Sequence, residues 1–269
     1  MNAEKQTFIT DDGVELAYFV SGSGERTAVL LAGYGAPAIS WGPQIDALNE
    51  AGIRTIALDR RCHGASERTE KGMNMLRHGK DVGELFEHLD LHDVILIGQS
   101  QGASTMWSFI KQFGTSRLSA VISVDQTPKM INEGDWQCGM VGLTPETRPT
   151  YFDTPLAAPN KKPIDTRIVM AIVQFGKDYV PFDQAATKDL LLSHADADWR
   201  DVVAGTDVPV FFIAGEGSPY WPPKHAEEMA KLAPKGSFYV MPGSGHAVNW
   251  ECVDEFNQVV LDYIKNLEA

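Results

Sequence analysis

The sequence has few cysteines, fewer basic than acidic residues and no long hydrophobic run, and each shortage excludes a class of protein. Cys62, Cys138 and Cys252 are odd in number and form no C-x-x-C pair, which argues against a disulfide framework and a zinc site. No run approaches the roughly 20 apolar residues that a membrane-spanning helix requires. The first residues also lack the apolar core of a secretory signal. We therefore expect a cytoplasmic protein that binds no metal.

The charge balance narrows the choice of partner. Acidic residues outnumber basic ones by 36 to 23, which gives a net charge of −13 at pH 7. Such a surface repels nucleic acids and anionic membranes, so we expect a small-molecule substrate and neither of those partners. With 269 residues, 43% of them hydrophobic, the chain can bury a large core as one domain or one domain with an insertion.

Short apolar runs alternate with helical patterns along most of the chain. This alternation is typical of crossover connections and predicts an α/β fold with a mainly parallel sheet covered on both faces. Two runs around residues 8–10 and 14–20, separated by Asp12-Gly13, instead predict an antiparallel hairpin at the sheet edge. The expected strands are 27–32, 53–58, 94–97, 121–124, 210–214 and 238–241; the expected helices are 43–51, 76–90, 101–113, 223–233 and 250–267.

Residues 126–206 break this alternation. They show no strand signal, are rich in Pro, Gly and aromatic residues, and are too many for a connecting loop. We predict a mainly helical cap inserted at 126–206, with 1–125 and 207–269 forming the core. Such a cap would lie over the carboxyl edge of the sheet, where open α/β sheets bind ligands. Its Trp136, Phe152 and Trp199 are candidates for substrate contacts and, equally, for the core of the cap itself.

The most informative motif is Gly98-Gln99-Ser100-Gln101-Gly102, between an apolar run at 94–97 and a helical pattern at 101–113. Strand, G-x-S-x-G and helix in this order predict a nucleophile elbow, a sharp turn that exposes a serine hydroxyl above the sheet. The two glycines are required because strand and helix approach so closely that a Cβ would clash. Ser100 is therefore the candidate nucleophile.

A serine hydroxyl needs a base to remove its proton. His246 is the best candidate among the seven histidines, because it lies in a Gly-rich loop between the last expected strand and the last helix. His63 follows the strand at 53–58 and could approach the pocket. The remaining histidines have weaker contexts: His88 and His92 flank a helix end, and His78, His194 and His225 are expected on the solvated surface.

Four segments carry a resemblance to a known family: residues 31–35 (LAGYG), 58–66 (LDRRCHGAS), 98–102 (GQSQG) and 245–246 (GH). Through them nearly the whole chain resembles the α/β-hydrolase superfamily with a cap domain, of the serine esterase and lactonase type. The resemblance implies a mostly parallel eight-stranded sheet flanked by helices, the chain order nucleophile then histidine, and catalysis without a cofactor. The segment 59–66 is expected to shape the sheet edge and not to take part in the chemistry.

The acidic residue that would orient His246 is harder to identify from the sequence. Most such proteins carry it after the seventh strand, where this chain has Ser218, which cannot stabilise an imidazolium. A minority carry it after the sixth strand, where Asp125 stands. We favour Asp125 over a turn or capping role, and Glu216 is the second candidate. Asp59 and Asp207 are expected in turns or loops.

Negative charge that develops on a substrate carbonyl needs donors already in place. The elbow offers the backbone N–H of Gln101 at the start of its helix. By the resemblance, the second oxyanion-hole donor is the backbone N–H of Tyr34, in the loop after the strand at 27–32.

The sequence therefore predicts a carboxylesterase-like enzyme that hydrolyses small to medium carboxylic esters or lactones through an acyl-enzyme. Dehalogenases and epoxide hydrolases of similar fold use an aspartate nucleophile, so Ser100 disfavours both. Hydrolysis of thioesters, amides or C–C bonds remains open, as does cofactor-free perhydrolysis. A receptor or pseudoenzyme on the same fold is a further alternative. A hydrogen bond of about 2.6–3.2 Å between Asp125 and His246 would favour an enzyme.

Overall fold

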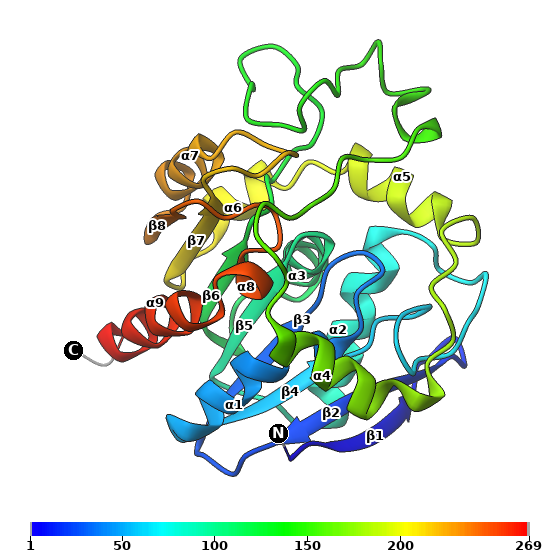
Figure 1. Ribbon diagram of the computed structural model, residues 1–269, viewed down its shortest axis with the longest axis vertical. Coiled ribbons are helices and arrows are strands. Elements are labelled where there is room, and N and C mark those ends of the chain that lie inside the picture. The colour runs from blue at the N-terminus through cyan, green and yellow to red at the C-terminus, as the bar shows by residue number, and fades with distance from the viewer. Residues whose placement is uncertain (1, 268–269) are drawn as a thin grey trace.

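The computed structural model describes residues 2–267 and all their side chains except that of Asp178. Its strands form one sheet in the order β1-β2-β4-β3-β5-β6-β7-β8, in which β1 and β2 run antiparallel to their neighbours and all other pairs are parallel (Figure 1). The predicted eight-stranded, mostly parallel sheet with an edge hairpin is confirmed. The strands are β1 (Glu4–Ile9), β2 (Glu15–Ser21), β3 (Arg26–Leu31), β4 (Ile53–Leu58), β5 (Val94–Gln99), β6 (Leu118–Val124), β7 (Val210–Gly215) and β8 (Gly236–Met241).

Helices cover both faces of the sheet. One face packs against α2 (Met75–His88), α3 (Gln101–Phe113) and α7 (Lys224–Leu232), and the other against α1 (Gly42–Glu50) and α9 (Val253–Asn266). The central strands therefore bury side chains on both faces, which explains their continuous apolar runs. None of the helices within residues 2–267 is long and apolar enough to cross a membrane.

One helix boundary differs from the expectation. The helix expected over 250–267 is divided into α8 (Val248–Glu251) and α9, because Cys252 between them leaves the helical conformation (φ −128, ψ 50). The interruption lets α9 lay Phe256, Val260 and Ile264 on the sheet, while α8 stays close to the loop that carries His246.

The chain between β6 and β7 carries α4 (Thr166–Phe175), α5 (Lys188–Asp196) and α6 (Arg200–Gly205), with short 3-10 turns at Tyr151–Asp153 (η2) and Gly176–Asp178 (η3). Turns and extended chain make up the remainder. Figure 1 shows this green-to-yellow segment passing above β6 and β7 and then descending to α4. There α4 packs against α1 and the 3-10 turn η1 (Ala38–Trp41). The division into a core and a cap at 126–206 stays a prediction.

Candidate active site

Ser100 lies in the sharp turn between β5 and α3, with φ 54 and ψ −128. A non-glycine residue at positive φ is strained, and such strain is typical of functional turns. A Cβ at Gly98 would lie 2.6 Å from the backbone nitrogen of Ala103, and one at Gly102 would lie 2.1 Å from the carbonyl oxygen of Leu31. Both glycines are therefore required by backbone contacts, as the motif predicted.

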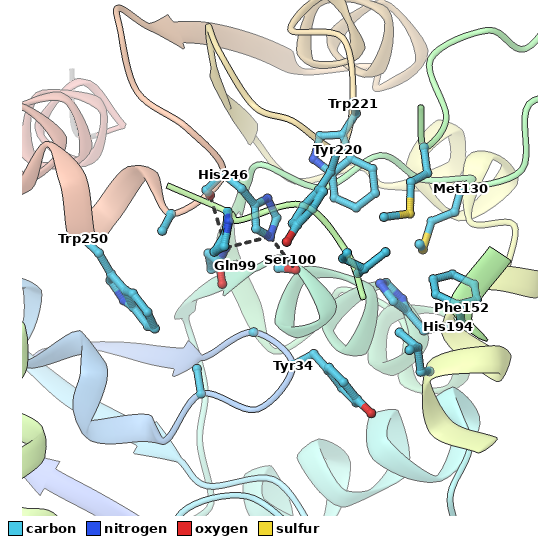
Figure 2. Close-up of a pocket in the computed structure, with 17 residues that line it drawn as sticks. Tyr34, Gln99, Ser100, Met130, Phe152, His194, Tyr220, Trp221, His246 and Trp250 are labelled. Atoms are coloured by element: carbon cyan, nitrogen blue, oxygen red, sulfur yellow. Dashed lines mark hydrogen bonds between the residues drawn. The ribbon is translucent and has the colours of Figure 1, made fainter. Parts of the chain in front are cut away.

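His246 bridges Ser100 and Asp125. Its Nε2 lies 2.9 Å from Ser100 Oγ, and its Nδ1 lies 2.7 Å from Asp125 Oδ2. A carboxylate can only accept, so Nδ1 carries the proton and Nε2 is left to accept the serine hydroxyl proton. Figure 2 shows the imidazole directly beside the Ser100 hydroxyl. The arrangement places a base where a serine nucleophile needs one.

Asp125 is held firmly at the carboxyl end of β6. Its carboxylate is fully buried and accepts hydrogen bonds from the backbone N–H of Gly215 (2.8 Å) and the indole N–H of Trp221 (3.1 Å). Burial alone would raise the pKa of this carboxyl, but contacts from His225 and His246 outweigh it and hold the pKa well below its usual range. Asp125 is thus ionised in the folded protein, as a group that supports an imidazolium must be.

Glu216, the second candidate for the acid, does not approach His246. Its side chain is exposed and accepts a hydrogen bond from the backbone N–H of Gly243 at 2.8 Å. Ser218, at the position where the resemblance first suggested an acid, accepts a long contact from the backbone N–H of Tyr220 (3.4 Å). Among the candidates, only Asp125 contacts the histidine.

The two expected oxyanion donors, Tyr34 and Gln101, belong to segments that adjoin Ser100. Tyr34 follows β3 in a loop that lines the same cavity as Ser100, and Gln101 is the first residue of α3. The first N–H groups of a helix have no partner within the helix. Across residues 2–267 neither of these two backbone N–H groups has a backbone acceptor. Both are therefore available, and their role stays a prediction.

Ser100 opens into a cavity of about 180 Å³. No Asp, Glu, Lys or Arg side chain is among the described residues that line it, and most of its surface is apolar (Figure 2). Drug-sized ligands usually occupy pockets of about 300–1,000 Å³, so this cavity suits a smaller, neutral molecule. Its main apolar and aromatic lining residues are Ala36, Met130, Met140, Phe152, Leu156, Pro159, Leu191, Tyr220, Trp221 and Trp250.

Of the three aromatic residues proposed for substrate contacts, only Phe152 lines the cavity. Trp136 does not line it; its side chain is buried and donates its indole N–H to the carbonyl of Lys129 at 2.9 Å, which favours the alternative of a structural role. Trp199 does not line it either; it packs into the core beside α3, so a core role is favoured for it as well. Sequence reasoning missed Tyr220 and Trp221, although both come within three residues of the position where the acid was sought.

Three histidines expected on the surface are buried instead. His78, His194 and His225 are 0–4% exposed. His225 Nε2 lies 3.5 Å from Asp125 Oδ1, and His194 lines the cavity with its Nδ1 unpartnered. Burial, together with the positive charge of Arg60, lowers the pKa of His194 to about 3, so its ring is neutral. A single histidine in a helical pattern gives no signal that separates these buried positions from exposed ones.

His63 is buried as well, and it does not line the Ser100 cavity. Its ring packs beside Tyr34 and Phe182, with ring centroids 6.3 and 4.8 Å away. It therefore supports the wall behind the cavity. Among the described residues, no three His, Cys, Asp or Glu side chains are grouped so that they could hold a metal ion.

Comparisons with known proteins identify the family of this chain. A sequence profile described as the alpha/beta hydrolase family matches residues 28–259. The chain belongs to the alpha/beta hydrolase family. It is 24% identical to a non-heme haloperoxidase of Rhodococcus erythropolis over 277 residues, covering 96% of this chain and 99% of that protein. It is 22% identical to a bifunctional esterase/perhydrolase of Acinetobacter calcoaceticus over 276 residues, covering 96% and 98%.

Among solved structures, an esterase from Exiguobacterium antarcticum superposes with a TM-score of 0.81 at 20% identity, covering 97% of this chain and 99% of that one. At this identity the likeness concerns the fold alone. The alpha/beta hydrolase fold and membership of a hydrolase family are therefore established for this chain.

Proposed function

We propose that this alpha/beta hydrolase is a serine esterase that hydrolyses small, neutral carboxylic esters or lactones. The observation that carries the proposal is the unbroken hydrogen-bonded chain from Ser100 Oγ through His246 to Asp125, at 2.9 and 2.7 Å, on the wall of an apolar cavity. The 2.7 Å contact also lies within the range that favours an enzyme over a receptor or pseudoenzyme.

The geometry supports a two-step acyl transfer. Ser100 Oγ attacks the carbonyl carbon while His246 Nε2 takes its proton, and the Tyr34 and Gln101 amides receive the charge on the carbonyl oxygen. His246 then returns the proton to the departing alcohol. Water, deprotonated by the same histidine, attacks the acyl-enzyme, and His246 returns that proton to Ser100 Oγ as the carboxylic acid leaves. Every group that this scheme needs belongs to the chain itself.

The cavity lining supports the choice of substrate. A charged acyl group would lose its hydration in the cavity with no ionic partner, which costs several kcal/mol. Small neutral esters and lactones avoid that cost, and their carbonyl is reactive enough for a serine nucleophile. The similarity to an esterase/perhydrolase is consistent with an ester substrate.

Perhydrolysis is a second candidate function, favoured by the similarity to a haloperoxidase and to a bifunctional esterase/perhydrolase. In this reaction hydrogen peroxide replaces water in the second step: its oxygen attacks the acyl carbonyl, Ser100 leaves with a proton, and a peroxycarboxylic acid is released. The same triad serves both reactions, and the small cavity admits a nucleophile of either size.

The test is hydrolysis of p-nitrophenyl acetate and butyrate by the wild type, by Ser100→Ala and by Ser218→Ala. Ser218 is a matched control because it lies near the site but outside the hydrogen-bonded chain. We expect turnover by the wild type and the control and loss of at least about 10³-fold in Ser100→Ala. Equal rates in wild type and Ser100→Ala would contradict the proposal. Adding hydrogen peroxide and assaying peroxyacetic acid tests the second function.

A further inference from the structure

Arg60 is a buried cation beneath the candidate active site that the chemistry described so far does not use. It follows β4, in the loop that begins at Asp59, and is 2% exposed. Burying a guanidinium is costly because it removes a full charge from water. The contacts that Arg60 makes in the interior must offset this cost.

Two of these contacts reach the two segments that carry the expected oxyanion donors. Arg60 Nη2 donates to the carbonyl oxygen of Gly33 at 2.8 Å, and Nη1 donates to Gln101 Oε1 at 2.6 Å. The carbonyl of Gly33 and the N–H of Tyr34 belong to one planar trans peptide, so they point in opposite directions. Because Arg60 binds the Gly33 carbonyl oxygen, the Tyr34 N–H at the other side of the peptide points away from Arg60.

The remaining contacts of Arg60 are to neutral rings. Nη2 lies 3.2 Å from His63 Nε2, and Nη1 lies 3.5 Å from His78 Nδ1. Burial and the nearby guanidinium hold the pKa of both histidines well below the usual value, so both rings are uncharged. The adjacent carboxylate of Asp59 is directed elsewhere, to the backbone N–H groups of Ala38 (2.6 Å) and Ala65 (2.8 Å).

The charge of Arg60 is therefore not cancelled by a directly bonded carboxylate among the described residues. Burial lowers the pKa of Arg60 to about 9, which still leaves it protonated at neutral pH. A fixed positive charge behind the Gly33–Tyr34 peptide also polarises that peptide, which strengthens its N–H as a donor. Both effects act on the Tyr34 N–H, which is the expected oxyanion donor.

We propose that Arg60 is a positioning residue for the oxyanion hole: it fixes the Gly33–Tyr34 peptide and the Gln101 side chain so that both backbone donors face the reacting carbonyl. The proposal rests on the serine esterase function above. It assigns Arg60 an effect on the transition state, where the oxygen is charged, and little effect on binding of the neutral substrate.

The test compares Arg60→Lys and Arg60→Met with Arg61→Lys. Arg61 is the matched control because it is also buried and lies in the same loop. Its guanidinium binds the Asp81 carboxylate at 2.7 Å and, among the described residues, donates no hydrogen bond to Gly33 or Gln101. Lysine at position 60 keeps the charge but cannot bind both Gly33 and Gln101, whereas methionine removes both charge and donors. Circular dichroism and thermal unfolding establish which variants are folded.

We expect kcat on p-nitrophenyl acetate to fall about 10-fold in Arg60→Lys and about 100-fold in Arg60→Met, with KM changed by less than about 3-fold. The inhibition constant of a trifluoromethyl ketone, which forms a charged tetrahedral adduct on serine, should rise by matching factors. Arg61→Lys should lose thermal stability while keeping kcat and the inhibition constant. Folded Arg60 variants with unchanged kcat, or with lower kcat and an unchanged inhibition constant, would overturn the proposal.

A measurement on the wild type keeps the proposal testable even if the Arg60 variants do not fold. In a crystal of the trifluoromethyl ketone adduct, the adduct oxygen should accept from Tyr34 N and Gln101 N, with Arg60 still bound to Gly33. An adduct oxygen held by other groups would contradict the role of Arg60. Absence of any Ser100-dependent turnover in the wild type would instead contradict the esterase function itself, so the two failures are distinguishable.

Discussion

The Asp125 carboxylate lies 2.7 Å from the imidazole of His246, although 121 positions separate the two residues in the chain. β6 ends at Val124 and delivers Asp125 to the carboxyl edge of the sheet, and the loop after β8 brings His246 to the same edge. The backbone N–H of Asp125 donates to the carbonyl of Ile213 at 2.7 Å, which anchors it to β7. The candidate acid therefore follows β6, and Ser218 occupies the position after β7 where the resemblance first suggested an acid.

This placement predicts a clear difference between two conservative variants. Asp125→Asn removes the charge that stabilises the His246 imidazolium and disturbs its tautomer, so kcat/KM should fall by about 10³–10⁴-fold. Glu216→Gln changes an exposed carboxylate that bonds only the Gly243 backbone in the described structure, so activity should stay within about 2-fold. Ester hydrolysis by the two purified variants, after thermal unfolding has shown that both are folded, is the measurement. The reverse order of activities would make Glu216 the acid.

The sharp turn at Ser100 predicts that replacing Gly102 by any larger residue destabilises the protein. Gly102→Ala would place a Cβ 2.1 Å from the carbonyl oxygen of Leu31, a backbone atom that cannot rotate away. We expect a loss of more than about 3 kcal/mol in the free energy of unfolding, or no folded protein. Gly205→Ala, in α6 with no atom within 4 Å of the added Cβ, is the control and should change stability by less than about 1 kcal/mol. Urea unfolding measures both, and equal stabilities would refute the packing argument.

The buried, neutral imidazole of His194 predicts a dependence of stability on pH. Its pKa of about 3 in the folded protein lies below the ordinary value of 6.5, so the unfolded chain binds more protons between these limits. The contribution of the neutral His194 ring to the free energy of unfolding is complete above about pH 6.5. It is lost as the pH falls towards 3, the pKa of His194 in the folded protein. Between pH 6.5 and 5 the loss from His194 alone is roughly 1.5 kcal/mol.

His194→Gln removes the titrating ring, so its unfolding free energy should fall less steeply with acid than that of the wild type. The measurement is urea unfolding at pH 6.5, 5.75 and 5.0 for both proteins. Identical slopes would mean that His194 is protonated in the folded state or titrates at its ordinary pKa.

The uncharged cavity predicts discrimination between acyl groups. p-Nitrophenyl hemisuccinate carries a carboxylate that would be buried among apolar residues without a cation, so its kcat/KM should be at least about 100-fold below that of the butyrate. The two substrates have acyl chains of equal carbon number, which keeps size nearly constant. Comparable values of kcat/KM would show that the acyl group does not enter this cavity.

Much of this architecture could be predicted from the sequence. The strands from β3 to β7 are apolar runs bounded by turns, and the motif around Ser100 specifies a turn that only glycine at positions 98 and 102 permits. The resemblance implied that the histidine follows the nucleophile in the chain, which agrees with the choice of His246. Asp125 could be proposed because an aspartate directly after a buried strand lies at the edge where the ligand binds.

The lining of the cavity could not be predicted in the same way. Nothing in the sequence distinguishes Trp136 from Trp221. In the structure the indole N–H of Trp136 donates to the Lys129 carbonyl, whereas that of Trp221 donates to the Asp125 carboxylate. Trp136 lies in the irregular chain that follows β6, and Trp221 lies in the loop between β7 and α7. Neither loop has a periodic pattern that would indicate which of its side chains face the cavity. The burial of His194 and His225 has the same origin, because it depends on long-range packing and not on neighbouring residues.

The central claim is that His246 activates Ser100 as a nucleophile, and labelling with a fluorophosphonate tests it most directly. The reagent phosphonylates only activated serines, and the adduct can be located in the tryptic peptide spanning residues 81–111, which holds Ser100. We expect one adduct per wild-type chain, on Ser100, with parallel loss of ester hydrolysis, and no adduct in the same time on His246→Ala. A wild-type chain that stays unlabelled, or is labelled at another residue while Ser100 remains free, would contradict the account.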